Sequence, residues 1–116
     1  MKITIDYKFD SVNEYVNKCR TNYHIANAVK QKETMLSTLM FYKLPKIEKY
    51  PIRLIFRWHM KSKIADLDGR LPKNIIDGLV RAKKIPDDNV KYIQEIVHKY
   101  IPDKKDYVEI ELEEIE

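Results

Sequence analysis

Alternating apolar and polar positions predict four β-strands in this chain. Residues 2–8 (KITIDYK) place Ile3, Ile5 and Tyr7 on one side and polar residues on the other, which is the period of a strand with one buried face. Residues 52–60 (IRLIFRWHM), 90–100 (VKYIQEIVHKY) and 107–112 (YVEIEL) are rich in β-branched and aromatic residues, which favour strands. The segment 102–105 (PDKK) has the composition of a turn and joins the last two strands.

Helical spacing of apolar residues predicts three helices. Ser11 and Glu14 form an S-x-x-E capping box at the start of the first helix, and the apolar rhythm breaks at 20–22 (RTN) before a second, longer helix. The third is predicted over Leu71–Lys83, with Pro72 in the first turn, where proline is tolerated. These elements predict an α+β fold, in which a four-stranded sheet, mixed or antiparallel, is covered by the N-terminal helical region and the Leu71–Lys83 helix.

The strand over residues 52–60 has two unlike faces. Ile52, Leu54, Phe56 and Trp58 form an apolar face that we expect to be buried. Arg53, Arg57 and His59 lie on the opposite face, where they meet either a phosphate backbone or water.

Composition indicates a single basic domain over residues 1–116, because a chain of 116 residues builds one core but not two. The net charge is +4, yet the last eight residues (EIELEEIE) hold five acids and no base, which leaves +9 on the rest. A polyanion is therefore the expected partner, although charge alone does not choose among DNA, RNA and lipid. We interpret the terminal EIELEEIE as a final strand with a frayed acidic end.

The single cysteine and the absence of long apolar runs indicate an intracellular protein. Cys19 excludes an internal disulfide, and its position on the apolar face of a helix predicts a small core residue. No apolar stretch reaches membrane-spanning length, and the N-terminus lacks a signal-peptide core. We expect a cytoplasmic protein with no membrane partner, in the host cytoplasm if it is encoded by a phage.

The candidate chemistry lies between residues 61 and 92. Asp66 and Asp68 stand two apart at the exit of a predicted strand, Asp77 lies in a helix, and Asp87 and Asp88 follow that helix. Close carboxylates repel by about 4 kcal/mol per pair at 4 Å with an effective dielectric near 20, so such a cluster needs a cation. Hard divalent ions such as Mg²⁺ fit, because they take one or two carboxylates and leave other positions to water and phosphate.

A basic surround favours phosphate as the substrate group. The expected DNA-binding residues are Lys61, Lys63, Arg70, Arg81, Lys83 and Lys84, with Lys73 among them in the sequence. The sequence lacks the motifs of a calcium loop and of a zinc site. The D-L-D-G segment fails as a calcium loop because it continues with Arg70 and Leu71, and the histidines are scattered over three elements, so no zinc site is expected.

This stretch resembles the RusA family of Holliday-junction resolvases, small dimeric magnesium-dependent endonucleases found in phages and prophages. The family pattern is an Asp-x-Asp, a helix with a lysine and an aspartate one turn later, and then an aspartate pair. The resemblance implies that Asp66, Asp68 and Asp88 are catalytic and hold the metal, and that Lys73 is catalytic. The segments SVNEYVNKCRTN and DDNVKYI also look like the branch from phages of Gram-positive bacteria.

The supporting residues and two departures complete the comparison with the family. Asp77 and Asp87 are possible supporting acids, with Asp77 orienting Lys73 or a metal-bound water. Gly69 stands where the family has asparagine, and one extra residue lies between Asp68 and Lys73.

The resemblance implies hydrolysis of branched DNA, a four-way junction, by a homodimer with Mg²⁺, for which Mn²⁺ can substitute. Two alternatives stay open on the residues alone. One is a non-catalytic nucleic-acid-binding protein of the same fold, and the other is a flap or RNA nuclease that uses the same acids. Taken singly, the acids read as solvated loop residues, and Lys73 with Asp77 reads as an exposed helix pair.

Overall fold

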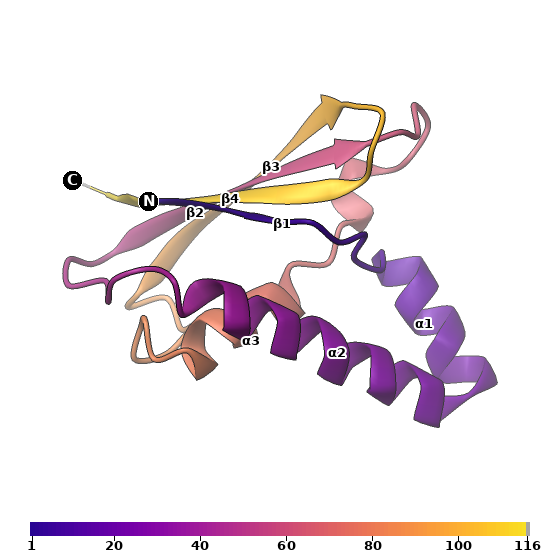
Figure 1. The fold of residues 1–116 in the computed structure, drawn as a ribbon, viewed down its shortest axis with the longest axis horizontal. Coiled ribbons are helices and arrows are strands. Elements are labelled where there is room, and N and C mark those ends of the chain that lie inside the picture. The colour runs from indigo at the N-terminus through magenta and orange to yellow at the C-terminus, as the bar shows by residue number, and fades with distance from the viewer. Residues whose placement is uncertain (116) are drawn as a thin grey trace.

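A computed structural model describes residues 1–115 and has the predicted α+β fold (Figure 1). Its helices are α1 (Val12–Thr21), α2 (Tyr23–Phe41) and α3 (Lys73–Arg81), and a 3-10 turn, η1 (Leu67–Gly69), precedes α3. Its strands are β1 (Lys2–Ile5), β2 (Ile52–Met60), β3 (Ile93–Pro102) and β4 (Tyr107–Glu114). The four strands form one mixed sheet, which confirms the expected fold class.

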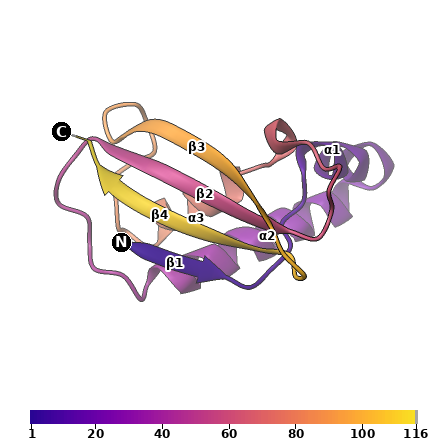
Figure 2. The same ribbon diagram turned by 90° about the horizontal axis from the view of Figure 1, so that it is seen from above.

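The sheet has the order β1-β4-β2-β3 (Figure 2). Strand β4 is antiparallel to both β1 and β2, whereas β3 is parallel to β2. The turn at 102–105 therefore joins two strands that are not neighbours, because β2 lies between them. The N–H of Asp103 donates to the carbonyl of Met60 at 3.1 Å, so this turn crosses the end of β2.

Three elements are shorter than their sequence patterns predict. Strand β1 ends at Ile5 instead of residue 8, because the Tyr7 N–H donates to the Ile5 carbonyl at 2.9 Å and turns the chain there. Strand β3 begins at Ile93 because the Asn89 carbonyl accepts the N–H groups of Tyr92 and Ile93, each at 3.0 Å, which closes a turn before the strand. Helix α3 ends at Arg81, and Lys83 has a φ of 59°, a left-handed conformation that does not continue a helix.

The core lies between the sheet and the layer formed by α2 and α3, which cover the same face (Figures 1 and 2). The apolar face predicted for β2 is buried there, as are Ile75 and Leu79 of α3. The two helices approach closely at Gly78, where an added Cβ would stand 2.5 Å from the Cβ of Ser37 and 2.8 Å from the backbone nitrogen of Thr38. Glycine at 78 thus allows this packing.

The other face of β2 carries ion pairs with acidic neighbours. Arg53 contacts Glu95 and Glu113, Nη1 of Arg57 lies 2.8 Å from Oε1 of Glu111, and Nδ1 of His59 lies 3.0 Å from Oδ2 of Asp103. The Arg57 hydrogen bond holds the pKa of Glu111 below its ordinary value. Residues 107–114 thus form a strand, as expected, in which Glu111 and Glu113 contact Arg57 and Arg53. The frayed end expected at residue 116 lies outside the described residues.

Helix α1 begins as predicted but lies outside the core. Ser11 Oγ accepts the Glu14 N–H at 3.2 Å, and Glu14 Oε1 accepts the Ser11 N–H at 3.2 Å, so the capping box is formed. The helix projects beyond the end of the sheet and packs along α2 (Figure 1), and it has no buried residue. Cys19 is accordingly exposed, and its expected place in the core is wrong.

None of the described helices combines the length and the apolar character needed to cross a bilayer.

Candidate functional site

One polar group from the predicted site centres on Lys73, an exposed side chain in the first turn of α3. Its Nζ lies 2.9 Å from Oδ1 of Asp77, one turn along the same helix, and 3.8 Å from Oδ2 of Asp88 in the loop after α3. The hydrogen bond with Asp77 is the main cause that raises the pKa of Lys73 above its ordinary value. The structure thus brings together three of the predicted residues from two segments of the chain.

The loop after α3 gives its two aspartates different tasks. Asp87 Oδ1 accepts the backbone N–H of Asp88 at 2.8 Å, and Oδ2 accepts the side-chain amide of Asn89 at 3.0 Å. The first of these bonds is the main reason that the pKa of Asp87 is lowered. Buried Ile85 anchors the loop to the core. Asp87 therefore holds the turn, and Asp88 is the member of the pair that faces Lys73.

A pocket of about 370 Å³ lies beside this group. It is lined by acids and bases from α2, α3 and the following loop, namely Lys30, Gln31, Thr34, Asp77, Val80, Arg81, Asp87 and Asp88. Lys30 was not identified from the sequence, because nothing in the local pattern of α2 distinguishes it from any other exposed lysine. Its place at the pocket depends on the packing of α2 against α3.

Asp66 and Asp68 lie on the segment that leads into α3. Asp66 is the residue before η1, and its backbone carbonyl accepts the Gly69 N–H and the Arg70 Nε, each at 3.3 Å. Both side chains are exposed, and within residues 1–115 neither carboxylate has a hydrogen bond or an ion pair. Leu67, which lies between them, packs against the core.

The predicted carboxylates do not form a closed metal cage. Among the described residues, no three Asp, Glu, His or Cys side chains converge closely enough to hold an ion by themselves. The donor set nevertheless suits Mg²⁺ in type, because Asp66 and Asp68 are unpartnered hard oxygen ligands. Mg²⁺ commonly uses one or two carboxylates and completes its shell with water and substrate phosphate.

The predicted DNA-binding residues form no ion pairs with carboxylates among the described residues. In the described part of the chain, no carboxylate lies within 4 Å of the charged groups of Lys61, Lys63, Arg70, Arg81, Lys83 or Lys84. Lys8, Lys61 and Arg70 line a second pocket of about 380 Å³ near the end of β2, together with Glu14 and Asp106. Arg81 and Lys83 lie at the other end of the segment, beside α3.

A scan against models of protein families matches none of them, and a search of curated proteins finds no match. The likeness to the RusA family therefore depends on the residues themselves, chiefly those between 66 and 92.

Proposed function

We propose that this protein is a metal-dependent endonuclease that hydrolyses branched DNA, with the four-way Holliday junction as its substrate. The observation that carries the proposal is the Lys73 ammonium, held by Asp77 and facing Asp88 beside a pocket. Phosphodiester hydrolysis builds negative charge on the non-bridging oxygens, and a prepositioned ammonium stabilises that charge. Lysine serves here as a point charge and not as a base.

Asp77 is the orienting partner of Lys73 in this proposal. The Lys73 side chain is exposed, and its 2.9 Å contact with Asp77 favours one direction of the ammonium before substrate binds. Asp88 approaches the same ammonium at 3.8 Å, which is long for a hydrogen bond, so its carboxylate can bind another cation.

We propose Mg²⁺ as the cofactor, with Mn²⁺ able to substitute, and Asp66, Asp68 and Asp88 as the residues that would hold it. When bound, the ion supplies a nucleophilic water and neutralises charge on the phosphate. The unpartnered state of Asp66 and Asp68 supports this assignment, since a carboxylate with no partner in the protein is available to a cation.

Substrate binding is assigned to the unpaired bases between residues 61 and 84. The paired arginines of β2 are already neutralised by glutamates, whereas Lys61, Arg81 and Lys84 have no such partner among residues 1–115. A DNA backbone therefore gains more from contact with the α3 side than with the open face of the sheet.

A homodimer follows from the proposed activity, because symmetric incision of a junction needs two active sites. Exposed Met35, Leu39 and Tyr42 are spaced as one stripe along α2, and this apolar surface supports the proposal that a second copy covers it. Sedimentation of the wild type and of Leu39→Glu tests it: a dimer that becomes a monomer in the variant is expected, and a monomeric wild type contradicts it.

The alternative is a nucleic-acid-binding protein without catalysis. The observation that favours it is the separation of the acids, since no three of them converge within the described residues. Calorimetry distinguishes the two: the nuclease takes up Mg²⁺ or Mn²⁺ when junction DNA is present, and the binder takes up neither.

The direct test is cleavage of labelled junction, flap, duplex and RNA substrates with Mg²⁺, each repeated with a chelator. The proposal expects metal-dependent nicking of the junction above all others. Preferential cleavage of the flap or of RNA would show that the substrate is not the junction. If none of the substrates is cleaved, the nuclease proposal fails and the nucleic-acid-binding protein without catalysis is the remaining candidate.

A further inference from the structure

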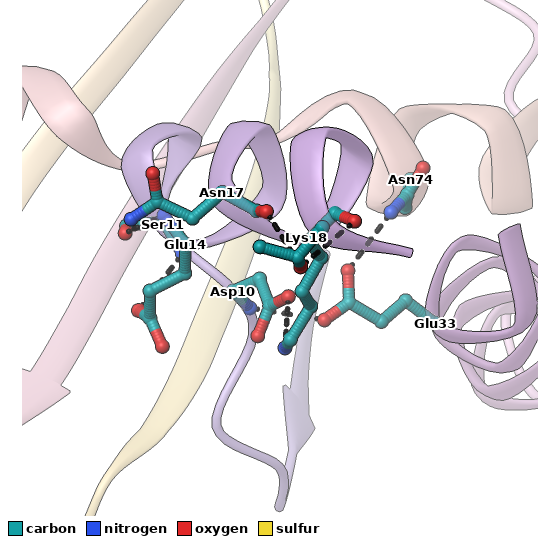
Figure 3. Close-up of polar contacts among 8 residues, drawn as sticks. Asp10, Ser11, Glu14, Asn17, Lys18, Glu33 and Asn74 are labelled. Atoms are coloured by element: carbon teal, nitrogen blue, oxygen red, sulfur yellow. Dashed lines mark hydrogen bonds and ion pairs between the residues drawn. The ribbon is translucent and has the colours of Figure 1, made fainter. Parts of the chain in front are cut away.

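Glu33 is a carboxylate buried inside the protein, with a side chain that meets two other segments, the one before α1 and the first turn of α3 (Figure 3). It lies in the middle of α2, and only 1% of its surface is exposed. Burial raises its pKa above the ordinary value, which records the cost of removing this acid from water. An apolar side chain would fill the same position without that cost, so the carboxylate needs a structural or functional reason.

Each oxygen of Glu33 accepts one hydrogen bond from a different part of the chain. Oε2 accepts the backbone N–H of Asp10 at 3.0 Å, and Oε1 accepts the side-chain amide of Asn74 at 2.8 Å (Figure 3). Asn74 is itself 4% exposed and belongs to the first turn of α3. Asp10 continues the network through an ion pair with Lys18 at 2.6 Å.

The first turn of α3 is held by this contact and not by a side-chain cap. The residue before the helix is Pro72, whose side chain offers no hydrogen bond to the first N–H groups of the helix. The Asn74 amide is a donor and does not cap those groups, but it anchors the first turn to Glu33 on another helix.

A second anchor lies one turn further along both helices. Gly78 is four residues after Asn74 and packs on Ser37, which is four residues after Glu33. Two contacts at matching i, i+4 positions fix both the rotation and the separation of α3 relative to α2. Lys73 and Asp77 each precede one anchor by a single residue, so their directions follow from this seam.

We propose that Glu33 is a positioning residue: through Asn74 it sets the rotation of α3 and so places the Lys73 ammonium against Asp88. The activity part of this inference rests on the proposed nuclease function, whereas the placement of Lys73 is independent of it. Lys73 and Asp77 share a helix and stay together if α3 turns, but Asp88 belongs to a separate loop. The Lys73 to Asp88 approach is thus the distance that reports on the rotation.

The experiment compares Asn74→Asp, Asn74→Ala and the exchanged pair Glu33→Gln with Asn74→Asp. Asn74→Asp places two carboxylates together and breaks the contact, whereas the exchanged pair restores it with donor and acceptor reversed. Lys18→Met is the matched control, because it removes the ion pair between Lys18 and Asp10, which belongs to the same network but does not touch α3. If Asn74→Asp does not fold, Asn74→Ala tests the loss of the same contact.

The first readout is the separation of the Lys73 Nζ and the Asp88 carboxylate in crystal structures of the wild type and of each variant, which is 3.8 Å in the wild type. We expect this separation to increase in Asn74→Ala and Asn74→Asp, to return in the exchanged pair, and to stay unchanged in Lys18→Met. An unchanged separation in both Asn74 variants would overturn the inference, as would an equal increase in Lys18→Met.

The second readout is junction cleavage, with kcat and KM measured separately below the melting temperature of every variant. We expect kcat to fall by up to about 100-fold in the Asn74 variants, as misplacement of a catalytic group by about 1 Å can cause, with KM little changed. The exchanged pair recovers most of kcat. If the wild type does not cleave but the Lys73 to Asp88 separation follows the expected pattern, the nuclease proposal fails and the positioning inference stands.

Discussion

The backbone of Gly78 lies so close to Ser37 that a methyl group on residue 78 would stand 2.5 Å from the Ser37 Cβ, a separation that packed carbons do not adopt. This contact is one of those that attach α3 to α2, together with the hydrogen bond from Asn74 to Glu33, and α3 carries Lys73 and Asp77. The candidate site is thus supported by a helix seam that contains none of its own residues.

Gly78→Ala is expected to destabilise the protein by about 1–3 kcal/mol, the usual cost of overpacking. Helix propensity alone predicts the opposite sign, a gain of about 1 kcal/mol for Ala over Gly inside a helix. Urea unfolding measures the difference. Gly69→Ala is the control, because its nearest contact would be an ordinary 3.7 Å from the Asp66 Cβ, and its stability should change little. A more stable Gly78→Ala would contradict the packing described above.

Asp88→Asn and Asp87→Asn should have different effects, although the residues are adjacent. Asp88 faces Lys73, so Asp88→Asn should reduce junction cleavage by about 100-fold or more and leave folding intact. Asp87 accepts two hydrogen bonds within its turn, so Asp87→Asn should act mainly on stability. Cleavage rates and melting temperatures of both variants check this. Equal loss of cleavage with equal folding would show that Asp87 has a direct role as well.

The Glu33 carboxyl should make stability depend on pH. Its pKa is raised above the ordinary 4.5 by burial, while the hydrogen bonds from the Asp10 N–H and the Asn74 amide oppose the shift. The folded state therefore binds this proton more tightly than the unfolded state, so the stabilisation by the proton is complete below about pH 4.5 and is lost as pH rises through the raised pKa.

We expect the wild type to lose stability relative to Glu33→Gln as pH rises above about 4.5, because glutamine does not titrate. Denaturant unfolding of both proteins across that range measures it. The burial of nearby Tyr7, whose pKa is raised to about 12, does not contribute in this range. A constant difference between the two proteins would contradict a raised pKa for Glu33.

DNA affinity should depend on the α3 side of the molecule and not on the open face of the sheet. Arg81→Gln and Lys84→Gln should each weaken binding and reduce the slope of log affinity against log salt by about 1, if each base contacts one phosphate. Arg57→Gln is the control, because Arg57 is already paired with Glu111. Titrations at several salt concentrations test this. A slope reduced by Arg57→Gln alone would place the DNA on the sheet.

The local patterns in the sequence were sufficient for the type and order of the elements and for the buried face of β2. The alternation in residues 52–60 predicted which side of β2 is buried, and the capping box placed the start of α1. Contacts between distant segments were not predictable in this way. Glu33 looked like any polar residue of a helix, and its burial arises only where α2, α3 and the segment before α1 meet.

Cys19 shows that the position of a helix relative to the sheet was also not predictable from the local pattern. Its spacing matches the apolar face of α1, but that face is buried only if the helix lies on the sheet, and α1 projects past the sheet instead. For the candidate site, the sequence order predicted the approach of Lys73 to Asp77 and Asp88. It gave no distance between Asp66 or Asp68 and that group, which depends on the path of residues 61–72.

The measurement that tests the central claim most directly is cleavage of a labelled four-way junction in Mg²⁺ by the wild type and by Asp68→Asn, with Asp6→Asn as the control, because Asp6 pairs with Lys105 away from the predicted site. We predict that the wild type and Asp6→Asn nick the junction and that Asp68→Asn binds it without nicking. Equal nicking by wild type and Asp68→Asn would contradict the assigned site.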